Sequence, residues 1–220
     1  MAETTELDAT AKRRSKSRGF LLASGCVLVV AMLAVTALLR NQSTELPTRV
    51  QPAPRERLDT PFIVTPPHIV DQMIELAELQ EDDLVYDLGC GDGRILIAAA
   101  QQAGCHAVGF DIDADLVRQA RENAKSAGVE HLVTVEQRDV LTVDLSKASV
   151  VMVYLLPWIM EKLIPQFDAM EPGSRIVAHD FRIAGCKPDK TIETTTGGPN
   201  GDLRFVHLWI TPLKKGTAPK

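Results

Sequence analysis

The chain has 220 residues, of which 45% are hydrophobic and 24% charged, and its formal net charge is −5. This globular composition excludes a wholly disordered, collagen-like or coiled-coil protein, and the length indicates one ordinary domain plus an appendage. A mildly acidic chain lacks the broad positive field that sequence-independent DNA binding requires. The four cysteines lie far apart without a CxxC pair, so we predict neither a disulfide framework nor a metal site.

The N-terminal appendage is dominated by an apolar run. Residues 19–39 carry no charged side chain, and five basic residues lie between positions 12 and 18. As a helix the run would be roughly 32 Å long, which matches the hydrocarbon core of a bilayer. We therefore predict a single transmembrane helix at 19–39 and a location in a membrane. The alternative is a cleavable signal peptide with Val35-Thr36-Ala37 near its cleavage site, but the run exceeds a usual signal-peptide core.

The remaining boundaries follow from shifts in composition. Residues 1–18 are predicted to be a disordered tail that ends in basic residues, and 40–60 a proline-rich extended linker. A folded domain is predicted over 61–213, followed by a solvated tail at 214–220. We expect the protein to be a monomer.

Within the domain, apolar runs of strand length alternate with segments of helical periodicity. The helices are predicted at 65–77, 95–100, 114–127 and 158–170, and the strands at 84–86, 108–110, 132–135, 150–155 and 175–179. Residues 191–196 and 204–211 flank the turn sequence GGPNGD, which predicts a closing hairpin. Such alternation predicts an α/β fold with a largely parallel sheet, whose ligands bind beyond the carboxyl ends of the strands.

A glycine-rich turn follows the first strand, in the form D-x-G-x-G-x-G, with Asp87, Gly89, Gly91 and Gly93. Glycines permit positive φ and let a ligand approach bare backbone, and the turn offers N–H groups at a helix start. The turn could serve packing alone. A dinucleotide-binding turn of the G-x-G-x-x-G type does not fit, because the glycines are evenly spaced and position 94 is arginine.

Two further carboxylates follow the next two strands. Asp111 lies 24 residues after Asp87, at the end of the second strand, where it could accept hydrogen bonds from both hydroxyls of a ribose. Asp139 follows the third strand, where a side chain can reach an adenine edge. Each acid alone could be an ordinary loop or capping residue, but three at successive strand tips indicate a nucleoside site.

This arrangement resembles the class I S-adenosyl-L-methionine (SAM)-dependent methyltransferases over roughly residues 61–212. The resemblance implies a Rossmann-like seven-stranded sheet whose last strand is antiparallel within a hairpin, and SAM as cofactor. It implies that Asp111 holds the ribose and that Asp139 lies near the adenine. The residues that would line the methionine end are Asp87, Gly89, Gly91 and Gly93.

A narrower resemblance rests on five blocks, PFIVTP, YDLGCGDGRILIAAA, VVMVYLLP, AHDF and KPDK. They are similar to the small membrane-associated protein lysine methyltransferases, including those acting on the ATP synthase c subunit and the adenine nucleotide translocase. The resemblance implies methyl transfer to a protein lysine amine, with a protein substrate that could itself be a membrane protein. Because the enzyme needs SAM, which is made in the cytosol, we expect the domain on a SAM-containing side, although the flanking basic residues favour the opposite side.

Catalytic candidates follow the fourth and fifth strands. Tyr154 is predicted to face the methyl-transfer site, and His179 and Asp180 to stand beside it. Alternatively, both residues have a structural role only: Tyr154 packs against its neighbours and His179 hydrogen-bonds to a loop. The Asn/Asp-Pro-Pro-Tyr motif of many enzymes that methylate nucleic-acid amino groups is absent, so no nucleic-acid partner is predicted. The competing functions are a small-molecule or lipid methyltransferase at a membrane and a SAM-binding module without catalysis.

Overall fold

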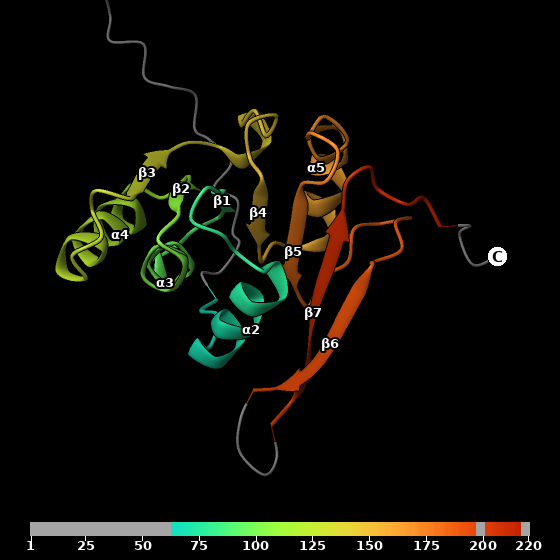
Figure 1. Ribbon diagram of the computed structural model, residues 1–220, viewed down its shortest axis with the longest axis horizontal. Coiled ribbons are helices and arrows are strands. Elements are labelled where there is room, and N and C mark those ends of the chain that lie inside the picture. The colour runs from blue at the N-terminus through green and yellow to red at the C-terminus, as the bar shows by residue number, and fades with distance from the viewer. Residues whose placement is uncertain (1–62, 197–200, 217–220) are drawn as a thin grey trace, which may run out of the picture. The chain divides into compact units, whose positions relative to one another are not determined.

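The computed structural model describes residues 63–196 and 201–216, which form one α/β domain (Figure 1). Its helices are α2 (Pro67–Ala77), α3 (Arg94–Ala103), α4 (Ala114–Ser126), the short 3-10 helix η1 (Val140–Thr142) and α5 (Pro157–Asp168). Its strands are β1 (Leu84–Leu88), β2 (His106–Asp111), β3 (Val133–Gln137), β4 (Val150–Val153), β5 (Arg175–His179), β6 (Lys190–Thr195) and β7 (Leu203–Ile210).

The strands form one seven-stranded sheet in the order β3-β2-β1-β4-β5-β7-β6. The first five pair in parallel, whereas β7 runs antiparallel to both β5 and β6. The predicted seven-stranded Rossmann-like sheet with its closing hairpin is thereby confirmed. The strand order reverses between β1 and β4, and ligands of open α/β sheets bind at such a reversal, beyond the carboxyl ends of the strands.

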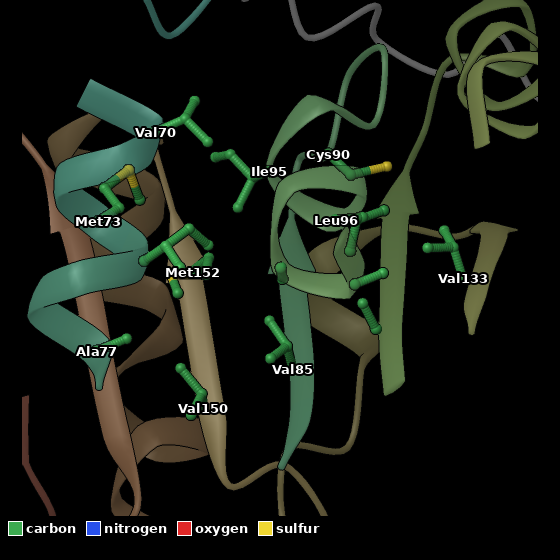
Figure 2. Close-up of a cluster of buried hydrophobic side chains, with 14 of the residues drawn as sticks. Val70, Met73, Ala77, Val85, Cys90, Ile95, Leu96, Val133, Val150 and Met152 are labelled. Atoms are coloured by element: carbon green, nitrogen blue, oxygen red, sulfur yellow. The ribbon is translucent and has the colours of Figure 1, made fainter. Parts of the chain in front are cut away.

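Two apolar cores cover the two faces of the sheet. One lies under α2, α3 and α4, where Met73 and Leu96 meet side chains of β1 and β4 such as Val85 and Met152 (Figure 2). The other lies under α5, where Leu163 and further α5 side chains pack on the opposite face of the strands. Because β4 is buried on both faces, its continuous apolar run is explained.

Helix boundaries largely follow local signals in the sequence. Asp113 caps α4, since its Oδ1 accepts hydrogen bonds from the backbone N–H groups of Asp115 and Leu116. The start of α2 differs from the prediction, because the helix begins at Pro67 after Pro66, and Thr65 makes no side-chain cap. Thr65 is instead buried, as part of an extended segment that precedes the helix.

The predicted membrane localisation requires correction. In the segments that the structure describes, no helix combines the length and the apolar character needed to cross a bilayer. The transmembrane helix predicted at 19–39 lies outside these segments, together with the tail at 1–18 and the linker at 40–60. We therefore withdraw the predicted single-pass membrane location.

The start of the predicted C-terminal tail contacts the folded domain. Lys214 and Lys215 form ion pairs with Asp189 and Asp168, and the Lys215 backbone bridges to Cys186. These contacts attach residues 214 and 215 to the domain, and the boundary at 213 remains a prediction.

Candidate active site

The glycine-rich turn joins β1 to α3 at the point where the strand order reverses. Gly89, Gly91 and Gly93 all have positive φ, of 78°, 53° and 80°, which other residues adopt only with strain. At Gly93 a side chain would also meet Cβ of Ala120 on α4 at 3.0 Å. The turn thus needs glycine for its backbone path and for its close approach to α4.

Asp111 is held directly against this turn. Its Oδ2 accepts a hydrogen bond of 2.9 Å from the backbone N–H of Gly91, and its Oδ1 accepts one of 2.9 Å from the backbone N–H of Asp113. The residue is 8% exposed. The structure therefore brings the predicted ribose-binding acid and the predicted methionine-binding turn into one site, as the parallel pairing of β1 and β2 requires.

Asp87 is the most unusual charged group of the site. It is only 2% exposed, and its Oδ2 has no hydrogen-bond partner among the residues that the structure describes. Burial, followed by the negative charges of Asp111 and Asp92, raises the pKa of Asp87 to about 8. Burying an ionised carboxylate without a partner costs free energy unless a ligand supplies a hydrogen-bond donor. This position therefore fits a positively charged group such as an amino acid ammonium.

Asp139 lies where the third strand ends. Its Oδ1 accepts a 2.9 Å hydrogen bond from the backbone N–H of Leu141 and so caps η1. The neighbouring Arg138 N–H donates to the carbonyl oxygen of Asp111, which joins the tips of β2 and β3. Ile112, which directly follows Asp111 in the chain, is 39% exposed, and sequence reasoning missed this apolar side chain.

Tyr154 follows β4 and lines the same pocket as Asp87 and Gly89. Its ring lies against His179, with centroids 4.0 Å apart, and stacks on Phe181 at 6.0 Å. Burial, assisted by the charge of Asp180, raises the pKa of Tyr154 above its ordinary value of 10.0. The hydroxyl therefore stays protonated at neutral pH.

His179 lies behind the tyrosine ring rather than in the open pocket. It is 2% exposed, and within the described part of the chain neither ring nitrogen has a hydrogen-bond partner. Burial lowers its pKa to about 4, although the nearby charge of Asp180 acts in the opposite direction. The imidazole is therefore neutral at physiological pH.

Asp180 occupies a strained turn after β5, with φ of 60°. Its carboxylate accepts hydrogen bonds of 3.1 Å from Arg204 and from the backbone N–H of Phe205. Phe181 N–H donates to the carbonyl oxygen of His179 across the turn. The predicted catalytic trio therefore forms one cluster, in which Asp180 is tied to β7.

Sequence reasoning missed a second group of residues that lines the pocket. Ile63, Val64 and Thr65 form part of its wall, together with Asp92 and Arg94 from the glycine-rich turn. Arg94 donates a 3.0 Å hydrogen bond to the carbonyl oxygen of Thr65. The block PFIVTP resembles the start of the domain in related enzymes, but its position in the wall could only be seen in the folded chain.

The sheet, the glycine-rich turn and the two carboxylates at its edge define a class I SAM-dependent methyltransferase. A family model described as "ANTKMT methyltransferase domain" matches residues 87–190. A "Protein-lysine N-methyltransferase" of Saccharolobus islandicus is 39% identical over 152 residues, which cover 68% of this chain and 92% of the relative. The chain belongs to this family of methyltransferases, and its cofactor is SAM.

Other relatives agree on the class and differ in the named acceptor. The lysine N-methyltransferase of the ATP synthase c subunit from Mus musculus is 31% identical over 85% of this chain and 71% of the relative. A solved structure titled "RNA methyltransferase from Salinibacter ruber in complex with S-Adenosyl-L-homocysteine" is 44% identical, with a TM-score of 0.62. It covers 68% of this chain and 94% of its own. The demethylated cofactor in that structure agrees with the assignment of SAM.

Proposed function

We propose that this enzyme transfers a methyl group from SAM to the ε-amino group of a protein lysine. The observation that supports this most directly is the charge of the acceptor side. Asp180 lies near the Tyr154 hydroxyl, while Arg204, the neighbouring base, is already paired with that carboxylate. Because the two charges are paired with each other, Arg204 is not free to bind a phosphate, which disfavours a polyanion as acceptor relative to a lysine amine.

The names of the relatives support the same acceptor. The relatives from Saccharolobus islandicus and Mus musculus carry names that specify lysine, whereas the Salinibacter ruber structure is titled an RNA methyltransferase. RNA is thus the second candidate. The net charge of −5 disfavours it, because phosphate backbones are bound by clustered basic side chains.

We propose that the cofactor is held by the groups that end β1, β2 and β3. The unpartnered Oδ2 of Asp87 would accept from the ammonium of its methionine part, beside the bare backbone of Gly89, Gly91 and Gly93. Asp111 would accept from the ribose hydroxyls, and Asp139 would lie at the adenine. When bound, SAM supplies an electrophilic methyl group, so the protein has to orient the acceptor and exclude water.

Tyr154 is proposed to orient the acceptor amine, because its protonated hydroxyl can accept a hydrogen bond from nitrogen and direct the lone pair. His179 and Asp180 are proposed to act behind it as positioning residues. His179 supports the ring, and Asp180 contributes negative potential and fixes the strained turn. A lysine must lose a proton before it can react, and partial burial beside Tyr154 lowers its pKa.

The acceptor class can be tested with purified enzyme, methyl-labelled SAM and a lysate of the source organism. We expect label that resists RNase, is removed by protease and yields methyl-lysine on mass spectrometry. RNase-sensitive label would overturn the lysine proposal in favour of RNA, and label extracted into organic solvent would indicate a lipid acceptor. SAM binding without labelling of any fraction would indicate a silent module.

Matched aspartate variants separate the proposed site from general effects on folding. Asp111→Asn removes the charge that is proposed to bind the ribose and leaves one oxygen for the two backbone N–H groups that Asp111 accepts from, so labelling should fall at least about tenfold. Asp115→Asn changes an aspartate whose side chain is 81% exposed on the first turn of α4, and labelling should be unchanged. Equal labelling by both variants would refute the assigned cofactor site.

A further inference from the structure

Arg94 joins the glycine-rich turn to the segment that precedes α2. Its Nε donates a 2.9 Å hydrogen bond to Oδ1 of Asp92, and a terminal nitrogen lies 2.5 Å from Oδ2 of the same carboxylate. The other terminal nitrogen donates a 3.0 Å hydrogen bond to the carbonyl oxygen of Thr65. One planar guanidinium therefore binds a carboxylate with two nitrogens and a distant backbone carbonyl with the third.

The segment reached by Arg94 is a wall of the pocket. Ile63, Val64 and Thr65 line it together with Asp87 and Gly89. Ile63 is 56% exposed and Val64 42% exposed, so burial in the core does not anchor these two residues. The hydrogen bond to the Thr65 carbonyl instead ties the segment to the turn.

Asp92, which binds the guanidinium, is itself held in place by α4. Its backbone carbonyl accepts a 2.9 Å hydrogen bond from the Asn123 side chain on α4. Its carboxylate, between Gly91 and Gly93, has a lowered pKa because the hydrogen bonds and charge of Arg94 outweigh partial burial. Asp92 is therefore hydrogen-bonded through its carbonyl to α4 and through its carboxylate to Arg94.

We propose that Arg94 is a positioning residue that holds residues 63–65 as a wall of the SAM pocket. This inference rests on the proposed location of the cofactor but not on the identity of the methyl acceptor. A wall of this kind slows escape of bound SAM and excludes water from it. Loss of Arg94 should therefore weaken SAM binding more than it slows the chemical step.

A competing explanation is that Arg94 merely neutralises Asp92, whose charge acts on the buried Asp87. The two explanations differ when both partners are removed. Asp92→Asn eliminates the unpaired charge left by Arg94→Ala, whereas it cannot restore the hydrogen bond to the Thr65 carbonyl.

The test measures the SAM dissociation constant by calorimetry, without any acceptor, for the wild type and three variants. We expect Arg94→Ala to bind about tenfold more weakly, as for loss of a charge-assisted hydrogen bond, and the Arg94→Ala/Asp92→Asn double variant to stay as weak. The control Arg118→Ala removes a surface arginine whose side chain is 66% exposed and should bind normally. Recovery in the double variant, or normal binding by Arg94→Ala, overturns the proposal.

Ile63→Ala supplies an independent test, because truncation of so exposed a side chain should leave folding intact. It should weaken SAM binding in the wild-type background and have no further effect in Arg94→Ala, where the wall is already displaced. Unchanged binding by Ile63→Ala, or full additivity of the two changes, contradicts the proposed wall. In the assay with methyl-labelled SAM, kcat of Arg94→Ala at saturating SAM should stay within about twofold of wild type while KM for SAM rises.

Discussion

The buried carboxylate of Asp87 should make SAM binding depend strongly on pH. In the ligand-free protein, burial and two neighbouring carboxylates raise its pKa to about 8, from an ordinary value of 3.8. An ammonium beside the unpartnered Oδ2 is attracted only to the ionised form. Below pH 8 the free protein is mostly protonated at this position, and binding must expel that proton.

The size of the effect follows from the ionised fraction. With a pKa of about 8, roughly 1% of Asp87 is ionised at pH 6 and about half at pH 8. If only ionised Asp87 binds a protonated ammonium, affinity should rise roughly tenfold from pH 6 to 7 and stop rising near pH 8, where an α-amino group itself loses its proton. Close to one proton should leave the protein for each SAM bound at pH 6.5.

Ionisation of Asp87 favours SAM binding but lowers the stability of the ligand-free protein. The folded pKa of Asp87 lies above the unfolded value, so the folded chain holds a proton that the unfolded chain has released between about pH 4 and 8. The contribution of Asp87 to the free energy of unfolding without ligand should therefore fall with rising pH, and the fall should be measurable between about pH 6.5 and 8, where His179 no longer titrates. Asp87→Asn should remove that fall while weakening SAM binding.

Calorimetric titrations in buffers of different ionisation enthalpy measure both the affinity and the proton release. The Asp87→Asn variant should bind weakly with a flat pH profile, and Asp115→Asn should behave as wild type. A wild-type dissociation constant that is constant from pH 6 to 7.5, without proton release, would refute the assignment of Asp87 as the buried partner of a cation.

Three further predictions concern the rest of the domain. Gly109→Ala should lower the free energy of unfolding by about 1–3 kcal/mol in urea titrations, because its methyl group would meet a neighbouring side chain at 2.4 Å. His179 has a folded pKa lowered to about 4, so its contribution to stability should fall as pH drops from about 6.5 to 4, opposite to that of Asp87; in an Asp87→Asn background the loss should therefore be visible, and His179→Phe should abolish it. Tyr154→Phe should lower kcat about tenfold in the labelling assay and leave the SAM dissociation constant unchanged.

The strands and helices were predictable because their signals are local. Residues adjacent in the sequence suffice to predict β4, from its apolar run, and the hairpin of β6 and β7, from the glycines between them. The start of α2 was misplaced because Thr65 is a good capping residue in isolation. In the folded chain Thr65 is buried in the pocket wall and its carbonyl accepts from Arg94.

The cofactor side of the candidate site was predictable for a related reason. Asp87 and the glycines share one short segment, and Asp111 follows the next strand, which pairs with β1 in parallel. The register of two adjacent strands then suffices to bring them together. The unpartnered state of the Asp87 oxygen was not predictable, since it depends on what all surrounding elements leave unsatisfied.

The wall of the SAM pocket and the acceptor side depend on pairings between distant parts of the sequence. Arg94 reaches a carbonyl 29 residues away, and Arg204 reaches Asp180 across 24 residues, from β7 to the turn after β5. No spacing rule predicts either contact. Their effect is substantial, because the first connects the wall to the turn and the second fixes the charge beside Tyr154.

Relatives of similar identity carry names with different acceptors, and we propose that the acceptor side of the pocket varies while the cofactor side stays the same. The family match covers residues 87–190, which include the glycine-rich turn, Asp111, Tyr154 and Asp180 but neither residues 63–65 nor Arg204. Lysine and RNA methyltransferases have the cofactor chemistry in common, so the match by itself does not name the acceptor. We propose that the side of the pocket formed by Tyr154, Asp180 and Arg204 selects the acceptor. There the guanidinium of Arg204 is already engaged by a carboxylate and is less available to a phosphate, which is the physical ground for preferring lysine.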